Sequence, residues 1–154
     1  WLPVATQGEP EKEVDDLKAA LSKLEIDGIV SGALRSDYQK TRLERMSEEL
    51  GIKSFTPLWH QSSKSHMSNL VANGFKVMIT GVSTEGLDSE WLGCVLDEES
   101  LQDLTCIASK YRFHVDGEGG EYETLVVAGP HMIGELEIDY VKHWDGVRGH
   151  LSFQ

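Results

Sequence analysis

Cysteine is scarce in this sequence, which contains Cys94 and Cys106 and no others among its 154 residues. Two isolated cysteines cannot form a disulfide framework or a Cys-x-x-Cys metal site, so a disulfide-stabilised secreted domain is excluded. Long apolar runs are also missing, and none approaches the roughly 20 residues of a membrane-spanning helix. We therefore expect a reduced, soluble, cytoplasmic protein without a membrane partner.

Positive charge is in short supply. The chain has 14 lysines and arginines against 26 aspartates and glutamates, which gives a formal net charge of −12. Because so acidic a surface repels a phosphate backbone, direct binding of nucleic acid is not expected outside a local basic pocket. The apolar residues, 40% of the chain, are nevertheless enough for a substantial hydrophobic core.

The common catalytic and phosphate-binding motifs are missing as well. There is no Gly-x4-Gly-Lys-Ser/Thr loop, no Gly-x-Gly-x-x-Gly after a strand and no Gly-x-Ser-x-Gly elbow. His60 and His66 have the wrong spacing for adjacent metal ligands on a helix, so no metal site is predicted from them. Any chemistry must therefore come from less common motifs.

The apolar residues alternate between helical and strand periodicity, which predicts an α/β fold. An apolar stripe over residues 14–24 predicts a helix, Ile26–Val30 predicts a short strand, and Asp37 is expected to cap a helix over residues 37–50. The near-continuous apolar segment Phe75–Val82 predicts a parallel strand buried on both faces. The rest of the chain is strand-rich, with strands expected over residues 122–127, 135–141 and 149–153.

A local excess of positive charge lies between residues 31 and 45, directly after the first predicted strand. This segment has four basic residues against two acidic ones. A helix N-terminus at the carboxyl end of a parallel strand favours anions, so one reading is a site for a nucleotide or phosphate. The other reading is a solvated helix face with ordinary ion pairs, such as Arg45 with Glu49. The residues by themselves leave both readings open.

An acidic, glycine-rich segment lies at Asp116–Thr124. Its three glycines allow a close approach of the backbone, but its four acidic residues would repel a phosphate. The segment is better suited to a cation, such as Mg²⁺, an ammonium group or a quaternary nitrogen, with cation–π contacts from Trp59, Trp91 or Tyr122. The alternative is an acidic hairpin loop whose aromatic neighbours lie in the core.

Four segments, taken in order, resemble the diphthine–ammonia ligase (diphthamide synthetase) family, a branch of the N-type ATP pyrophosphatases. They are Asp27–Glu44, Thr56–Trp59, Gly86–Gly93 and Gly117–Thr124, and the last contains the specific block Glu-Gly-Gly-Glu-Tyr-Glu-Thr. The resemblance implies a HUP-like doubly wound parallel sheet with a β-rich C-terminal portion. It also implies two parts, the remainder of a nucleotide-binding domain over residues 1–82 and a substrate-binding portion over residues 83–154.

The resemblance further implies a ligase that uses ATP, with Mg²⁺, to adenylate the carboxylate of diphthine on translation elongation factor 2. Ammonia, supplied as ammonium, then displaces AMP to give the amide. Diphthine also carries a trimethylammonium group, which suits the acidic loop. The expected site comprises Glu118 and Glu121 as catalytic residues, Ser31, Gly32, Gln39 and Arg42 at the nucleotide, and Trp59, Trp91, Gly119, Gly120, Tyr122, Glu123 and Thr124 at the substrate. This site requires the two segments at 31–45 and 117–124 to face one cleft.

One departure from the family concerns its N-terminal signature. The family has a Ser-Gly-Gly-x-Asp-Ser pyrophosphate loop after its first strand, and this sequence, which opens at Trp1, does not contain it. We therefore expect that the N-terminal strands of the sheet are missing and that the chain alone is inactive. The alternatives are an N-type ATP pyrophosphatase with another carboxylate or a tRNA as acceptor, and a non-catalytic binding module. A homo-oligomer is also left open.

Overall fold

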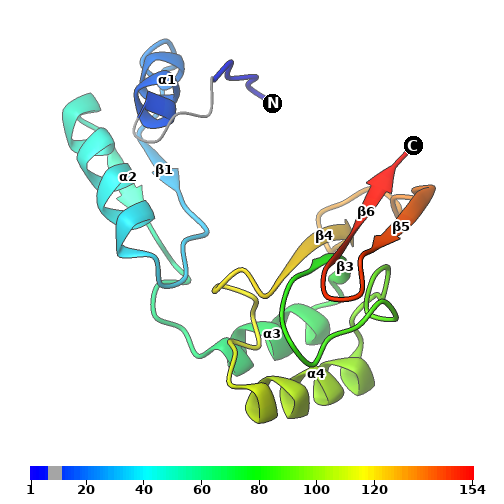
Figure 1. Ribbon diagram of the computed structural model, residues 1–154. Helices are drawn as coiled ribbons and strands as arrows, with labels where there is room; N and C mark the ends of the chain where they lie inside the picture. The colour runs from blue at the N-terminus through cyan, green and yellow to red at the C-terminus, as the bar shows by residue number, and fades with distance from the viewer. Residues whose placement is uncertain (7–11) are drawn as a thin grey trace. The chain divides into compact units, whose positions relative to one another are not determined.

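The computed structural model describes residues 1–6 and 12–154, which form two compact units, residues 1–60 and 61–154 (Figure 1). Each unit is described by itself. The division falls at His60, so residues 61–82, which we expected in the first part of the chain, belong to the second unit. The reason is that β3 (Lys76–Val82) pairs with later strands, β4 (Tyr122–Ala128) and β6 (Gly149–Phe153).

The first unit is a small parallel α/β arrangement. Its elements are α1 (Lys12–Leu21), β1 (Gly28–Val30), α2 (Asp37–Leu50) and β2 (Lys53–Phe55). β1 and β2 pair in parallel, and α2 is the segment that connects them. The predicted short strand and the helix after it are therefore confirmed, and the parallel pairing agrees with an α/β fold.

Local capping residues fix the ends of α2 and the start of α4 (Glu98–Tyr111), whereas α1 begins and ends a few residues before the stripe expected over residues 14–24. Ser36 caps α2 by accepting a hydrogen bond from the N–H three residues later at 3.3 Å, so the cap lies one residue before the expected Asp37. Gly51 ends α2 in the left-handed region with a φ of 70°. In the second unit, Asp97 and Ser100 form a reciprocal capping box for α4. No helix in the described part of the chain is long and apolar enough to cross a membrane.

The second unit combines two helices, α3 (Ser63–Ala72) and α4, with a four-stranded sheet in the order β4-β3-β6-β5. β5 is Tyr140–Trp144, which begins later than the strand expected at 135–141. All strand pairs in this sheet are antiparallel. The prediction of a parallel strand at Phe75–Val82 is therefore wrong. Most residues of β3 are buried. A continuous apolar segment indicates that a strand is buried on both faces, but it does not indicate whether the strand is parallel or antiparallel to its neighbours.

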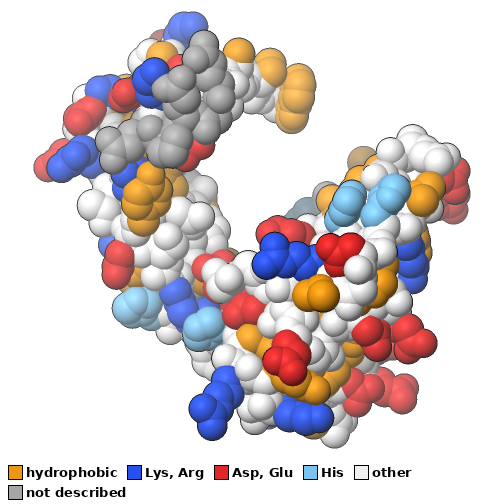
Figure 2. Space-filling view, in the orientation of Figure 1, with side chains coloured by type: hydrophobic (Ala, Val, Ile, Leu, Met, Phe, Trp, Pro, Cys, Tyr) orange, Lys and Arg blue, Asp and Glu red, His pale blue; other side chains and the backbone are white. Residues whose placement is uncertain are grey.

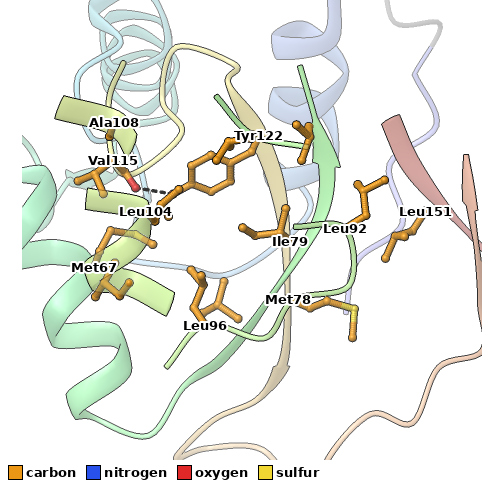
Figure 3. Packing of buried hydrophobic residues seen from close by; sticks show 14 of the residues in the cluster. Met67, Met78, Ile79, Leu92, Leu96, Leu104, Ala108, Val115, Tyr122 and Leu151 are labelled. Carbon is orange, nitrogen blue, oxygen red and sulfur yellow. Dashed lines mark hydrogen bonds between the residues drawn. The ribbon is translucent and has the colours of Figure 1, made fainter. Parts of the chain in front are cut away.

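One hydrophobic core holds the second unit together (Figure 3). Ile79 from β3, Leu92 from the loop after β3 and Leu104 from α4 are all completely buried. The same loop is fastened to β3 by the hydrogen bond from the Leu96 N–H to the Val77 carbonyl at 2.8 Å. Each fully buried side chain of this size contributes about 1.5–3 kcal/mol. This core fixes the sheet whose outer positions carry the polar residues described below.

Candidate functional site

Three of the four expected nucleotide residues, Ser31, Gln39 and Arg42, line one cavity of about 320 Å³ in the first unit. Tyr38 lines the same cavity, and the guanidinium carbon of Arg42 lies 3.2 Å from the centroid of its ring. This cation–π contact orients the arginine. Gly32 is exposed and outside the lining, and a Cβ there would meet nothing within 4 Å. The remaining wall consists of the apolar side chains Val14, Leu17 and Leu43 and of one acidic residue, Glu13.

Ser31 is fixed at the end of β1. Its N–H donates to the Phe55 carbonyl at 2.8 Å, and its Oγ accepts from the Ala33 N–H at 3.2 Å. Ser31 therefore shapes the bend from a buried position. The cavity offers an apolar surface for a base, an amide for hydrogen bonding and a guanidinium for a phosphate, so its residues fit a nucleotide.

The alternative for the basic segment at residues 31–45, an exposed helix face with ordinary ion pairs, is partly confirmed in the same unit. Lys40 forms an ion pair with Glu44 one turn later, and its Nζ lies 5.3 Å from the centroid of the Trp59 ring. Trp59 also stacks on His60, with the ring centroids 4.6 Å apart. Trp59 thus already has a cationic neighbour within its unit. The acidic loop belongs to the other unit, so the requirement of one shared cleft stays a prediction.

The acidic loop consists of two successive turns. The Gly117 N–H donates to the His114 carbonyl at 2.9 Å, and the Gly120 N–H donates to the Gly117 carbonyl at the same distance. Gly117 and Gly120 have positive φ values of 73° and 80°, which glycine adopts without strain. Turn geometry therefore accounts for two of the three glycines in the loop.

Glu121 folds back onto this loop. Its carboxylate accepts hydrogen bonds from the backbone N–H of Gly119 at 2.7 Å and of His114 at 3.1 Å. A Cβ on Gly119 would lie 2.5 Å from a carboxylate oxygen of Glu121, so a larger residue there would displace the end of the Glu121 side chain. Glu118, by contrast, is exposed and makes no hydrogen bond or ion pair with a described residue. The geometry thus favours Glu121 as a residue that holds the loop and Glu118 as one that can meet a ligand.

Tyr122 supports the loop from the core. Its side chain is buried, and its hydroxyl donates to the carbonyl of Val115, as Figure 3 shows. Burial raises the pKa of this hydroxyl far above its usual value, and the carboxylates of Asp116 and Glu121 add to the shift. The arrangement agrees with the alternative of an aromatic residue in the core. It does not favour direct contact between this ring and a cation.

The other expected substrate residues of the second unit have different surroundings. Trp91 is half-buried against the hydrophobic core, and its backbone N–H donates to the Asp88 carbonyl at 3.2 Å. Glu123 and Thr124 are exposed on β4. Of these residues, Glu123 lines a polar cavity of about 660 Å³ on the sheet.

That cavity contains residues that the sequence interpretation missed. It is lined by Glu123 together with Lys142, His143, Arg148 and His150, and Ser83 lies at its edge with the acidic loop. Ser83 donates from its hydroxyl to the Gly120 carbonyl and from its N–H to the Glu121 carbonyl, so the loop and the cavity are contiguous. The sequence feature that could have indicated this cavity is a group of four basic or imidazole side chains between residues 142 and 150 of a strongly acidic chain.

The carboxylate of Glu121 does not fit the Mg²⁺ that the resemblance implies. Both oxygens of Glu121 are engaged by backbone N–H groups. Over residues 1–6 and 12–154, no group of three or more His, Cys, Asp or Glu side chains is arranged to hold a metal ion. We assign no step to Mg²⁺.

The first unit is a parallel α/β arrangement with an arginine-lined cavity, and the second unit has an antiparallel sheet with a second cavity. The chain is therefore a two-unit α/β protein with a separate cavity in each unit. The sequence comparisons extend this to a family. The chain belongs to the diphthamide synthase family: the model of the family's C-terminal domain matches residues 62–154, and that of its N-terminal domain matches residues 2–54. These limits agree with the division of the structure at His60.

Curated relatives carry a consistent name. The diphthine–ammonia ligase of Bos taurus is 34% identical over 142 residues, which cover 89% of this chain and 52% of that protein. The diphthine–ammonia ligase of Mus musculus is 36% identical over 141 residues, which cover 88% of this chain and 52% of that protein. The Saccharomyces cerevisiae protein of the same name is 31% identical over 163 residues, which cover 92% of this chain and 23% of that protein. The chain thus spans about half the length of its mammalian relatives, or less in the yeast case.

The comparisons do not support one expectation. We expected the N-terminal part of the fold to be missing, yet the N-terminal family model matches residues 2–54, and the structure has a parallel strand pair there. The absence of one short loop signature was too narrow a basis for that expectation. The expected inactivity of the chain rested on the same argument and loses that support; whether the chain forms AMP is decided by the experiment given below.

Proposed function

We propose that the protein is a diphthine–ammonia ligase, an AMP-forming carbon–nitrogen ligase of diphthamide biosynthesis. The observation that carries this proposal is the match of both parts of the chain to the two diphthamide synthase domains, supported by the names of the relatives. The substrate is the diphthine form of translation elongation factor 2, with ATP and ammonium as the other reactants. A cytoplasmic location and any homo-oligomer stay predictions.

The reaction proceeds in two steps. A carboxylate oxygen of diphthine attacks the α-phosphorus of ATP, so that an oxygen–phosphorus bond forms and the bond to pyrophosphate breaks. The nitrogen of ammonia then attacks the activated carbonyl carbon, a carbon–nitrogen bond forms, AMP leaves and a proton is released. A carboxylate is a poor electrophile until it is activated. Positioning and stabilisation of charge therefore provide most of the catalysis.

The first unit supplies the nucleotide side of this proposal. Arg42 faces the phosphates, and its contact with Tyr38 limits the conformations of the guanidinium. Gln39 supplies an amide to the nucleotide, while Ser31 and Gly32 form the bend beside it. Trp59, which lies in this unit next to Lys40, is assigned to the substrate and not to the nucleotide.

The second unit supplies the acceptor side. Glu118 accepts a proton from ammonium and so generates the nucleophile, because it is exposed and unpaired with any described residue. Glu121 acts as a positioning residue: its carboxylate holds the loop backbone, so that Gly119 and Gly120 can lie against the substrate. Glu123 attracts the cationic group of the substrate, with Thr124 beside it on β4 and Trp91 on the neighbouring loop.

The activity is tested by mixing the purified protein with ATP, ammonium and elongation factor 2 that carries diphthine. We expect AMP and amidated factor in equal amounts, measured by chromatography and mass spectrometry. Elongation factor without diphthine, and a reaction without ammonium, are the controls. AMP formation that ignores diphthine would support another acceptor, and tight binding of the factor without any AMP would support the binding module; either result overturns the proposal.

The nucleotide side is tested with two arginine variants on the same helix. Arg42→Gln is expected to weaken ATP binding about tenfold, because a charged hydrogen-bonding partner of the phosphates is lost. Arg45→Gln is the matched control, since Arg45 lies outside the 320 Å³ cavity. Both affinities are measured by isothermal titration calorimetry. Equal weakening by the two substitutions would mean that general electrostatic attraction, and not the cavity, holds ATP.

A further inference from the structure

A row of four residues crosses the outer face of the sheet in the second unit. Glu123 on β4 pairs with Gly81 on β3, Gly81 pairs with His150 on β6, and His150 pairs with His143 on β5. Residues directly opposite each other on paired strands project to the same face. The two imidazoles stack, with ring centroids 4.9 Å apart and an angle of 19° between the planes. Figure 2 shows the paired histidines on this face, close to basic and acidic side chains.

Gly81 leaves a hollow in the middle of this row. A Cβ at Gly81 would lie 3.3 Å from the Cβ and Cγ of Glu123, so any larger residue would crowd that wall. The 660 Å³ cavity lies here, between Glu123 on one side and His143 and His150 on the other. We call it the β3–β6 pocket and define it by Gly81, Glu123, Lys142, His143, Arg148 and His150.

The walls of the β3–β6 pocket carry opposite charges. Within the described part of the chain, Glu123, Lys142 and Arg148 form no ion pair with any partner. Asp145 also borders the pocket, and its Oδ1 accepts from the backbone N–H groups of Arg148 and Val147. These hydrogen bonds, together with the positive charge of the nearby Arg148 side chain, lower the pKa of Asp145, which is committed to the turn between β5 and β6. Unpaired charges of both signs around one hollow favour a ligand that also carries both.

We propose that the β3–β6 pocket binds a small zwitterion, with its ammonium group against Glu123 and its carboxylate against His143, His150 and Arg148. A simple anion over Gly81 would face the carboxylate of Glu123, and a simple cation would face the guanidinium and the imidazoles. A ligand with both charges satisfies the two walls together. Diphthine, with its trimethylammonium group and the carboxylate to be amidated, belongs to this class, and that identification rests on the proposed function.

The binding is tested on the intact chain with three probes: glycine betaine as the zwitterion, acetate as its anionic half and tetramethylammonium as its cationic half. The imidazole signals of His143 and His150 are followed by NMR, and His131, exposed in a loop outside the pocket, serves as the internal reference. We expect betaine to bind about tenfold more tightly than either half. Equal affinities for betaine and acetate, or shifts that include His131 to the same extent, would overturn the proposal.

Substitutions on the two walls of the pocket test the contact with the ammonium group of the ligand and the contact with its carboxylate separately. Glu123→Gln is expected to weaken betaine about fivefold and to leave acetate unchanged or tighter, and His150→Gln to weaken both betaine and acetate. Glu137→Gln and His131→Gln, both exposed and outside the pocket, are the matched controls and should change neither affinity. No effect of Glu123→Gln on betaine would contradict the proposed orientation.

The outcomes separate this inference from the ligase activity. If AMP forms with diphthine-bearing elongation factor but betaine does not bind, the pocket proposal fails and the proposed function stands. If betaine binds as expected but no AMP forms, the proposed function fails and the zwitterion site stands.

Discussion

The carboxylate of Glu121 holds the glycine-rich loop through two backbone N–H groups, those of His114 and Gly119. Hydrogen bonds to a charged acceptor are among the stronger ones in proteins, at about 1.5–3 kcal/mol each. Glu118 lies in the same loop but makes no such contact with the described residues. Two acidic residues of one motif therefore have different environments.

This difference predicts different effects of the same substitution at the two positions. Glu121→Gln places an amide NH₂ against a backbone donor, so amide hydrogen exchange at His114 and Gly119 should become about tenfold faster. Glu118→Gln should lower ligase activity and leave that exchange unchanged. Exchange is measured by NMR or mass spectrometry on the intact chain. Unchanged exchange in Glu121→Gln would show that its carboxylate does not hold the loop.

Tyr122 gives a second test at the scale of one residue. Tyr122→Phe removes the hydroxyl that donates to the Val115 carbonyl and leaves that buried carbonyl unsatisfied. The expected cost is about 1–3 kcal/mol in the free energy of unfolding, measured by urea denaturation. Tyr111→Phe is the control, because Tyr111 is less buried and its hydroxyl has no recorded hydrogen bond among the described residues. Equal losses in the two variants would contradict the structural role of the Tyr122 hydroxyl.

At the scale of the elements, local sequence predicted much of what was found. The helix α2 was expected and ends at Gly51, and the strand β1 lies within the segment expected for it, although Ser36 caps the helix in place of the expected Asp37. The direction of β3 was mispredicted, because the partners of Val77 and Val82 lie at least 40 residues later in the chain. They are Val126 and Tyr122 on β4, and Val82 also pairs with Gly149 on β6. Pairing over such separations leaves no periodic signal in the strand itself.

The stabilisation that the capping box gives to α4 depends on pH. Hydrogen bonds from Ser100 lower the pKa of Asp97 below its ordinary value. A lowered pKa in the folded state means that the stabilisation is present above the unfolded pKa and is lost as the pH falls through the folded value. The Tm of the wild type should therefore fall more steeply than that of Asp97→Asn between about pH 5 and pH 3.

The control for the capping box is Asp97→Ala, which removes both the charge and the hydrogen bond. It should lower the Tm at neutral pH, where Asp97→Asn retains a capping acceptor. Thermal unfolding is followed by circular dichroism. Parallel pH profiles for the wild type and Asp97→Asn would show that the carboxylate charge contributes nothing to the cap.

At the scale of the whole molecule, the second unit has a hydrophobic core of its own. The described residues of this core lie between Met67 and Leu151, and none of them comes from residues 1–6 or 12–60. We therefore expect residues 61–154 to fold as an isolated fragment, with dispersed NMR signals and a cooperative thermal transition. A fragment with native-like secondary structure but no cooperative transition would show that the core depends on the rest of the chain.

The amino-acid sequence alone determined the acidic charge, the α/β class, the ends of the helices and the motifs that resemble the diphthamide synthases, because each depends on composition or on residues a few positions apart. Tertiary structure alone decided that β3 is antiparallel, that Tyr122 is a buried support and that Glu121 is engaged by its own loop. It also brought Glu123 beside His143 and His150. These features depend on strand register and burial, which arise only when distant segments pack together.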